Sequence, residues 1–323
     1  MMERVLDASV QARRRDRDVS LGAAFVVMVA FFIIGPFVVY PVFLMKALCF
    51  ALFACAFNLL IGYVGLISFG HALFFGWASY LTAYAAKTWG LPPELAIGIG
   101  TATAAVLGVI AGGLAIRRQG IYFAMITLAL SQMMYFFALQ AKFTGGEDGI
   151  QGVPRGRLFG VFNLANEGTM YVFVLVVVLA GFLLIYRIIN SPFGEVLKAI
   201  RENEQRTISL GYNTERYKLV AFVLSATLAG LAGSLNSLVF QLASLTDVHW
   251  TMSGDVVLMT LLGGLGTVFG PVVGAFLVIA MQNYLAPFGQ WVLVIQGAIF
   301  VVCVLLFRRG IVGEIAHLLR VQL

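Results

Sequence analysis

The chain has 323 residues, of which 61% are hydrophobic and only 11% are charged. Soluble domains carry roughly 25% charged residues, so this composition excludes a soluble globular protein and indicates a polytopic membrane protein. The excess of 21 Lys and Arg over 15 Asp and Glu does not indicate nucleic-acid binding, because most basic residues flank apolar runs.

The first twenty residues are basic, with an arginine cluster at positions 13–17 that precedes the apolar run 21–40. A cleaved signal peptide is the main alternative. The run is longer than an ordinary signal core, however, and no clear small-x-small cleavage site follows it. The sequence therefore predicts a basic cytoplasmic tail over 1–20, to which no role is assigned, and a retained first span.

Stretches of about 20 apolar residues are long enough to cross a bilayer. We therefore predict an all-α fold, a transmembrane helical bundle with about ten crossings. The candidate segments are 21–41, 44–62, 66–86, 94–115, 120–139, 170–188, 217–241, 254–264, 270–286 and 289–307. The eighth is short and glycine-rich, so whether it crosses fully stays open.

The positions of the basic residues support this topology, because cytoplasmic loops carry an excess of Lys and Arg. With a cytoplasmic N-terminus and ten crossings, the residues left outside are Lys46, Lys87, Lys142, Arg155 and Arg157. Without the eighth crossing, Arg308 and Arg309 would also lie outside. We expect a permease domain over 21–309 and a cytoplasmic tail over 310–323. The protein would lie in the bacterial inner membrane with both termini on its cytoplasmic side.

Two hydrophobic segments, 62–72 and 262–271, are interrupted by glycines. Such interruptions can expose backbone groups to a pore or a ligand. Tight turns between packed helices explain the same pattern, and both interpretations stay open. The candidate pathway positions are backbone groups and small polar side chains around Ser68, Gly70, His71, Thr127, Ser131, Gly263 and Gly264.

The glycine-rich segment 140–168 is the longest predicted outside connection. Its length fits a docking surface for an external partner, and it equally fits a flexible link between two spans. The residues alone do not decide between these interpretations.

The stretch 191–218 is the longest charge-dense segment after the tail. Ser191 suits a helix N-cap, Pro192 the first helical position, and Gly211 a left-handed end of the element. An apolar row and a charged rim lie at helical spacing. The row is Phe193, Val196, Leu197 and Ile200, and the rim is Lys198, Arg201, Glu202 and Glu204. A solvated loop is the alternative. For a helix, we expect the row to pack partly against the protein's own spans and the rim to face a partner.

Enzyme motifs are missing from the sequence. It has no GxxxxGK[ST] phosphate-binding loop, and His71, His249 and His317 are far apart without an HExxH context. Cys49, Cys55 and Cys303 have no CxxC spacing, so no metal site or disulfide framework is predicted. No midplane carboxylate is evident either, because Lys46, Glu94 and Asp255 lie near predicted outer ends. Energy for transport is therefore expected from a partner.

Five fragments, in the same order, resemble the LivM-type permease of branched-chain amino acid ABC importers. They are ISFGHALFFGWASY (67–80), RQGIYFAMITLALSQM (118–133), TGGEDGIQGVP (144–154), SPFGEVLKAIRENEQRTISLGYNTERYKLVAFVLSATLAGLAGSL (191–235) and LLGGLGTVFGPVVGA (261–275). The resemblance covers roughly residues 44–309. It implies the membrane subunit of an ATP-driven importer for branched-chain or related hydrophobic amino acids.

The resemblance also implies partners: a second, LivH-like permease, two cytoplasmic ATPase subunits that use ATP and Mg, and a periplasmic binding protein. The chain itself would be no enzyme and bind no cofactor. The loop 191–215 is similar to the family's ATPase-coupling element, through Phe193, Gly194, Ala199, Ile200, Arg201, Glu202, Asn203 and Gly211. Relatives that move urea, short amides or aromatic acids are not distinguished. A stand-alone secondary transporter is the alternative from another class.

Overall fold

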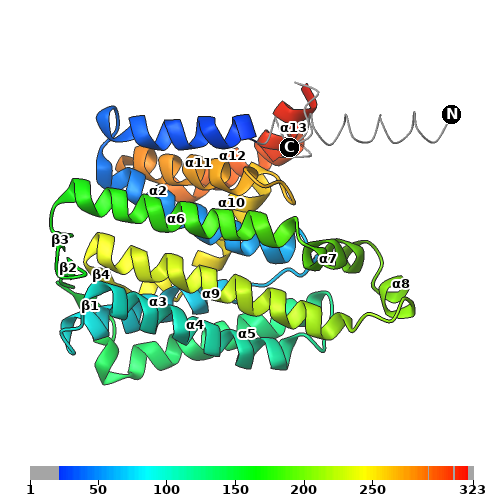
Figure 1. The fold of residues 1–323 in the computed structure, drawn as a ribbon, viewed down its shortest axis with the longest axis horizontal. Helices are drawn as coiled ribbons and strands as arrows, with labels where there is room; N and C mark the ends of the chain where they lie inside the picture. Colours follow the sequence, from blue (N-terminus) through cyan, green and yellow to red (C-terminus); the bar gives the residue numbers. More distant parts are fainter. Residues whose placement is uncertain (1–21, 290, 308–309, 319–323) are drawn as a thin grey trace.

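The computed structural model describes residues 22–289, 291–307 and 310–318. The chain folds into a bundle of helices whose long axes run roughly side by side (Figure 1). After a first helix over 22–34, the α-helices are α2 Pro41–Ile61, α3 His71–Lys87, α4 Pro93–Ala115, α5 Ile121–Gln140, α6 Glu167–Ile189, α7 Pro192–Glu202, α8 Glu204–Ser209, α9 Thr214–Phe240, α10 Trp250–Gly263, α11 Gly270–Leu285, α12 Trp291–Leu306 and α13 Gly310–Leu318.

Six segments of the described chain are helical, long and apolar enough to cross a membrane. They are α2, α4, α5, α6, α9 and the run Gly270–Phe288, which joins α11 to the 3-10 turn η4 (Ala286–Phe288). The predicted all-helical, polytopic architecture is thus confirmed. A helix also occupies each of the other four segments that the hydropathy pattern marked, but these helices are shorter, so the number ten stays a prediction.

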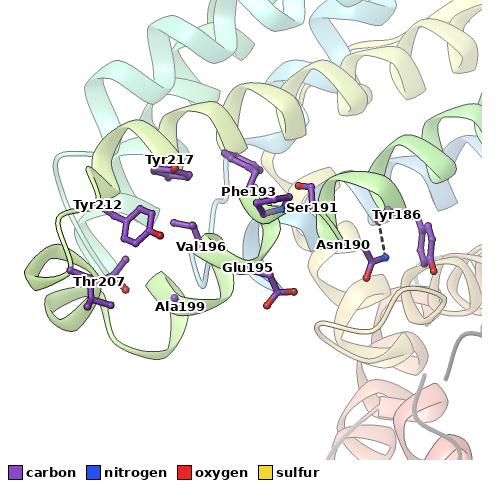
Figure 2. A pocket seen from close by; sticks show the side chains of 12 residues that line it. Tyr186, Asn190, Ser191, Phe193, Glu195, Val196, Ala199, Thr207, Tyr212 and Tyr217 are labelled. Atoms are coloured by element: carbon purple, nitrogen blue, oxygen red, sulfur yellow. Dashed lines mark hydrogen bonds between the residues drawn. The ribbon is translucent and has the colours of Figure 1, made fainter. Parts of the chain in front are cut away.

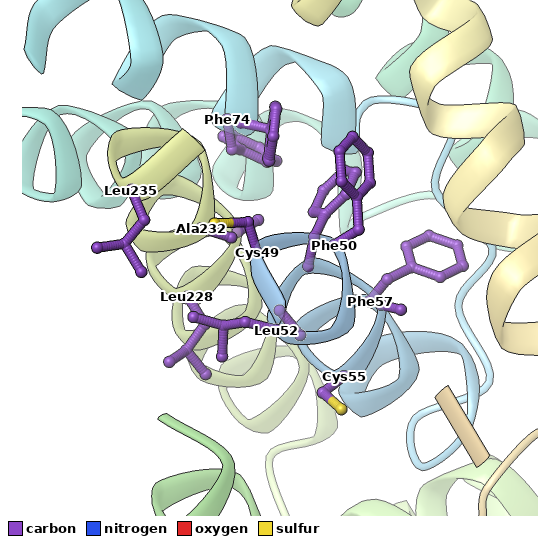
Figure 3. Packing of buried hydrophobic residues seen from close by; sticks show 14 of the residues in the cluster. Cys49, Phe50, Leu52, Cys55, Phe57, Phe74, Leu228, Ala232 and Leu235 are labelled. Carbon is purple, nitrogen blue, oxygen red and sulfur yellow. The ribbon is translucent and has the colours of Figure 1, made fainter. Parts of the chain in front are cut away.

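Helix α2 lies at the centre of the bundle, and its most apolar stretch is 94% buried. It is hydrophobic on all sides, which is the pattern of a helix surrounded by others. Helices α6, α9, α10 and α11 pack against it, and Phe75 of α3 reaches it through Phe50 and Phe53. Figure 3 shows part of the buried core, with Phe50 and Phe57 from α2, Phe74 from α3 and Leu228 from α9.

Helix α9 packs so closely on α3 that only small residues fit at the contact. A Cβ added to Gly233 would lie 2.0 Å from the carbonyl oxygen of Phe75. Small side chains allow such close backbone approach between membrane helices. The close packing of α9 therefore depends on its run of small residues.

Helices α3 and α10 have 17 and 14 residues, so each spans less than the roughly 30 Å apolar core at 1.5 Å per residue. The connections before them enter the bundle instead. Val248 lies against α3, because a Cβ on Gly76 would be 2.8 Å from the Val248 Cα. The amide of Ala72 donates to Ser253 Oγ at 2.9 Å. The two helices thus begin close together inside the protein.

The two ends of the bundle differ (Figure 1). Helices α7 and α8 project from one, which we call the α7 end. The opposite, strand end carries two antiparallel pairs, β1 (Ile150–Gln151) with β4 (Leu242–Ala243) and β2 (Arg157–Leu158) with β3 (Phe162–Asn163). Arg155 also donates to the Val239 carbonyl at 2.7 Å. The glycine-rich segment 140–168 is therefore folded against the bundle rather than a free link.

Candidate coupling and pathway sites

Helix α7 begins as its sequence predicts. The Ser191 side chain accepts a hydrogen bond from the Gly194 amide at 3.3 Å, and Pro192 occupies the first helical position. An N-cap of this kind satisfies an amide that the helix itself leaves unpaired. The start of the helix is therefore fixed against the end of α6.

The predicted end of this element is wrong, because the helix does not continue to Gly211. It ends at Glu202, where Asn203 takes an extended conformation with φ −157°. The Asn203 side chain then caps the separate helix α8 by accepting from the Arg206 amide at 3.0 Å. Gly211, with φ +90°, closes the turn after α8 instead.

The apolar row of α7 packs against the protein itself, as expected. Leu197 and Ile200 are buried, and Phe193 and Val196 are half-buried. The Phe193 ring stacks on Tyr217 of α9 with centroids 5.6 Å apart. α7 is consequently a fixed part of the bundle end and not a solvated loop.

The charged rim is only partly as predicted. Glu202 is exposed, and Lys198 pairs with Glu195 at 2.8 Å. Glu204 instead turns inward and forms an ion pair with Lys218, which is only 3% exposed. Gln119, in the connection between α4 and α5, donates to the same carboxylate at 2.9 Å. Arg201 also points towards the bundle, as described below.

A groove of ≈ 1240 Å³ lies beside α7. Figure 2 shows that the end of α6, α7, the α8 region and the start of α9 all contribute to it. It is lined by Tyr186, Asn190, Ser191, Pro192, Phe193, Glu195, Val196, Ala199, Thr207, Leu210, Tyr212 and Tyr217. Its walls combine aromatic rings with the Glu195 carboxylate, which is paired with Lys198.

Four of the candidate pathway positions come together in the bundle. The Phe69 amide donates to Thr127 Oγ1 at 3.2 Å, and the Gly70 amide donates to Ser68 Oγ at 3.2 Å. His71 Nε2 lies 2.9 Å from Ser225 Oγ. The four candidate positions and Ser225 are buried, and Ser131 is buried further along α5. In this conformation they hold the connection before α3 in place.

Gly263 and Gly264 lie elsewhere, at the end of α10. A Cβ on Gly263 would be 1.9 Å from the Gly270 carbonyl oxygen, and one on Gly310 would be 2.3 Å from the Gly264 Cα. These two glycines therefore pack against α11 and α13. The seven candidate positions form two separate groups rather than one site.

The two glycine-interrupted segments nevertheless meet, through a residue that the sequence analysis missed. Asn58 donates from Nδ2 to the Thr267 carbonyl at 2.9 Å and accepts at Oδ1 from the Gly266 amide at 3.0 Å. A Cβ on Gly62 would lie 2.8 Å from that same amide nitrogen. An asparagine near the end of the largely apolar α2 was the available signal.

Arg201 reaches this junction from α7. Its guanidinium donates a hydrogen bond to the Gly62 carbonyl. Burial raises the pKa of the neighbouring Tyr63 phenol above its ordinary value, and the positive charge of Arg201 acts in the opposite direction. The charged end of α7 is thus in contact with the connection between α2 and α3.

Two carboxylates near the start of α10 are withdrawn from solvent, Asp247 fully and Asp255 in part, while the expectation that none lies at the membrane midplane stays a prediction. Asp247, in the 3-10 turn η3 (Leu245–Asp247), is 8% exposed and accepts from the Ser244 amide at 3.2 Å. Asp255 in α10 accepts from Gln282 at 3.2 Å. Within the described residues, no three His, Cys, Asp or Glu are grouped as metal ligands.

An apolar helical bundle with six helical segments long enough to cross a bilayer defines a polytopic membrane protein. Helices α7 and α8 are packed at one end of this bundle. The chain belongs to the branched-chain amino acid transport permease family, whose model, "Branched-chain amino acid transport system / permease component", matches residues 40–304. This confirms the family resemblance. Membership also confirms the expectation of a permease component rather than an enzyme.

Named relatives agree with this assignment. The LivM permease of Escherichia coli is 27% identical over 79% of this chain and 65% of its own length. A probable LivM of Methanocaldococcus jannaschii is 30% identical over 53% of this chain and 51% of its own. The ribose import permease RbsC of Bacillus subtilis is 27% identical over 56% and 58%. No solved structure matches the chain.

Proposed function

We propose that this chain is the transmembrane permease subunit of an ATP-driven importer and forms half of the pathway for branched-chain or related hydrophobic amino acids. The relatives named for branched-chain amino acid transport support the substrate class. The ribose permease among the relatives shows that the family resemblance extends to other solutes. Urea, short amides and aromatic acids are therefore the competing substrates to test.

The observation that carries this proposal is the fixed position of α7 at the end of the bundle. A capped helix with a buried row and an exposed rim can transmit a push from a partner to the spans on either side. We assign ATPase coupling to Phe193, Gly194, Ala199, Ile200, Arg201, Glu202, Asn203 and Gly211, with the groove beside α7 as the docking surface. ATP and Mg would be bound by the ATPase partners.

The remaining partners are those that the family membership implies. A second, LivH-like permease would complete the pathway, and a periplasmic binding protein would meet the folded segment 140–168 at the strand end. Ten crossings of the bacterial inner membrane, with both termini in the cytoplasm, are part of this proposal. The pathway candidates stay Ser68, Gly70, His71, Thr127, Ser131, Gly263 and Gly264, although each also serves packing.

Purification of the detergent-solubilised complex from its native membrane tests the proposal. We expect an ATPase subunit to co-purify, and the reconstituted complex to take up leucine, isoleucine or valine only with ATP. Absence of any ATPase subunit would contradict it. Uptake of urea or an aromatic acid in place of these amino acids would correct the substrate alone.

A stand-alone, ion-coupled carrier is the second candidate, and the buried Asp247 is the observation that favours it. Carboxylates inside a membrane bundle often belong to proton or ion pathways. Uptake by proteoliposomes that contain this chain alone, driven by an imposed proton or sodium gradient without ATP, would establish this alternative.

A further inference from the structure

Arg201 occupies a crevice between two glycine turns. A Cβ added to Gly65 would lie 3.2 Å from the Arg201 Cγ, and one added to Gly266 would lie 3.1 Å from Nη1. The guanidinium donates to the Gly62 carbonyl between them. Although the residue as a whole is exposed, its charged end is directed inward, and glycine at 65 and 266 leaves room for it.

The two turns are tied to each other as well as to Arg201. Asn58 is 3% exposed and bonds to both Gly266 and Thr267, as described above. The turn at Gly62 follows directly on α2, and the turn at Gly266 joins α10 to α11. One polar junction therefore connects the ends of three helices with the last turn of α7.

The chemistry of this junction suits arginine in particular. The guanidinium is a planar fork of donors that stays charged, whereas lysine offers a compact ammonium with three donors. A hydrogen bond from a charged donor is stronger than one between neutral groups. A displacement of α7 that strains this bond would accordingly act on the Gly62 turn.

We propose that Arg201 is the positioning residue that links α7 to the junction of Asn58, Gly62 and Gly266, so that movement of α7 is passed to α2, α10 and α11. This inference rests on the proposed function, since it assigns the link inside the subunit through which ATP hydrolysis opens the pathway. Docking of the ATPase itself does not depend on this bond.

The test measures ATP hydrolysis and amino acid uptake together in proteoliposomes of the whole transporter. In R201M, the ATPase should co-purify and hydrolyse ATP as before. Uptake per ATP should fall about ten- to hundredfold, the factor expected for a lost hydrogen bond from a charged group. R201K should recover part of the ratio. R216M, at an exposed position in the first turn of α9, is the charge-matched control and should keep it.

A double-mutant cycle with N58L provides a second readout. If Arg201 and Asn58 act through one junction, N58L should lower the same ratio and the double variant should be little worse than R201M. An unchanged ratio in folded R201M, or additive losses in the cycle, would overturn the inference. Loss of the ATPase from R201M would also overturn it, by assigning Arg201 to docking. Failure of the wild-type complex to contain an ATPase would instead contradict the proposed function.

Discussion

Single side chains at the α7 end divide into those that hold the subunit together and those available to a partner. Glu204 and Arg201 belong to the first group, since their charges meet Lys218 and the Gly62 carbonyl. Glu202 belongs to the second, because it is exposed at the last residue of α7. Adjacent charged residues in the sequence therefore have opposite roles.

Charge reversal at the exposed position should weaken ATPase docking. We expect E202R to lower recovery of the ATPase at least about tenfold, since like charges placed across an interface cost several kcal/mol. Insertion of the subunit into the membrane should be unchanged. E167R, which alters an exposed acid at the start of α6, should retain the ATPase. Equal recovery from both variants would remove Glu202 from the interface.

At the scale of elements, α7 depends on its cap. Replacement of Ser191 by Ala removes the acceptor for the Gly194 amide and should destabilise the helix by about 1 kcal/mol. Amide hydrogen exchange over 192–202 should accelerate by about the corresponding factor of five. S191D, which keeps an acceptor at this position, should exchange like the wild type. Equal exchange in S191A and the wild type would show that packing alone maintains the helix.

The contact between α3 and α9 makes a matched pair of glycine substitutions possible. G233A should destabilise the bundle by about 1–3 kcal/mol, because the new methyl group collides with the backbone of α3. G113A should be neutral or slightly stabilising, since open space surrounds Gly113. Thermal unfolding in detergent, followed by loss of the monodisperse chromatographic peak, measures both. Similar melting of the two variants would contradict the packing.

Hydropathy predicted the membrane helices well but not the short ones. A run of apolar residues shows where a helix is favourable, yet α10 begins at Trp250, ahead of the predicted 254, because His249 caps it. The break at Asn203 was missed because no glycine or proline lies between Gly194 and Gly211 to mark it. The inward turn of Arg201 could not be foreseen either, since its partner lies 139 residues away. The local sequence pattern predicts which face of a helix is apolar and which is charged. Contacts with distant residues decide which of the charged side chains turn inward.

At the scale of the whole molecule, the topology can be tested directly. N163C, at an exposed residue of β3, should react with a membrane-impermeant maleimide on intact, outer-membrane-permeabilised cells. E202C should react only after the inner membrane is opened. Cys49 and Cys55 are buried, and the half-buried Cys303 is replaced by alanine in both variants to keep the background low. Labelling of both positions from one side would contradict the ten-crossing arrangement.

The seven pathway candidates show what whole-molecule folding adds to sequence patterns. Their glycines and small polar residues correctly marked two breaks in the apolar segments. The same pattern could not show that the breaks meet through Asn58, or that Gly263 and Gly264 lie apart from Ser68 and His71. The meeting depends on the packing of α10 and α11 on α2, which no local spacing encodes.

The pairing of β1 with β4 has a mechanical consequence. Ile150 and Gln151 pair with Ala243 and Leu242 in an antiparallel ladder, and only six residues separate this ladder from the first residue of α10. A ladder of two residues per strand has few bonds to break. A pulling force on segment 140–168 would therefore separate β1 from β4 and release the constraint that this pair places on α10. A load at the strand end would thus be transmitted to α10, whose other end lies beside the junction of Asn58, Gly62 and Gly266.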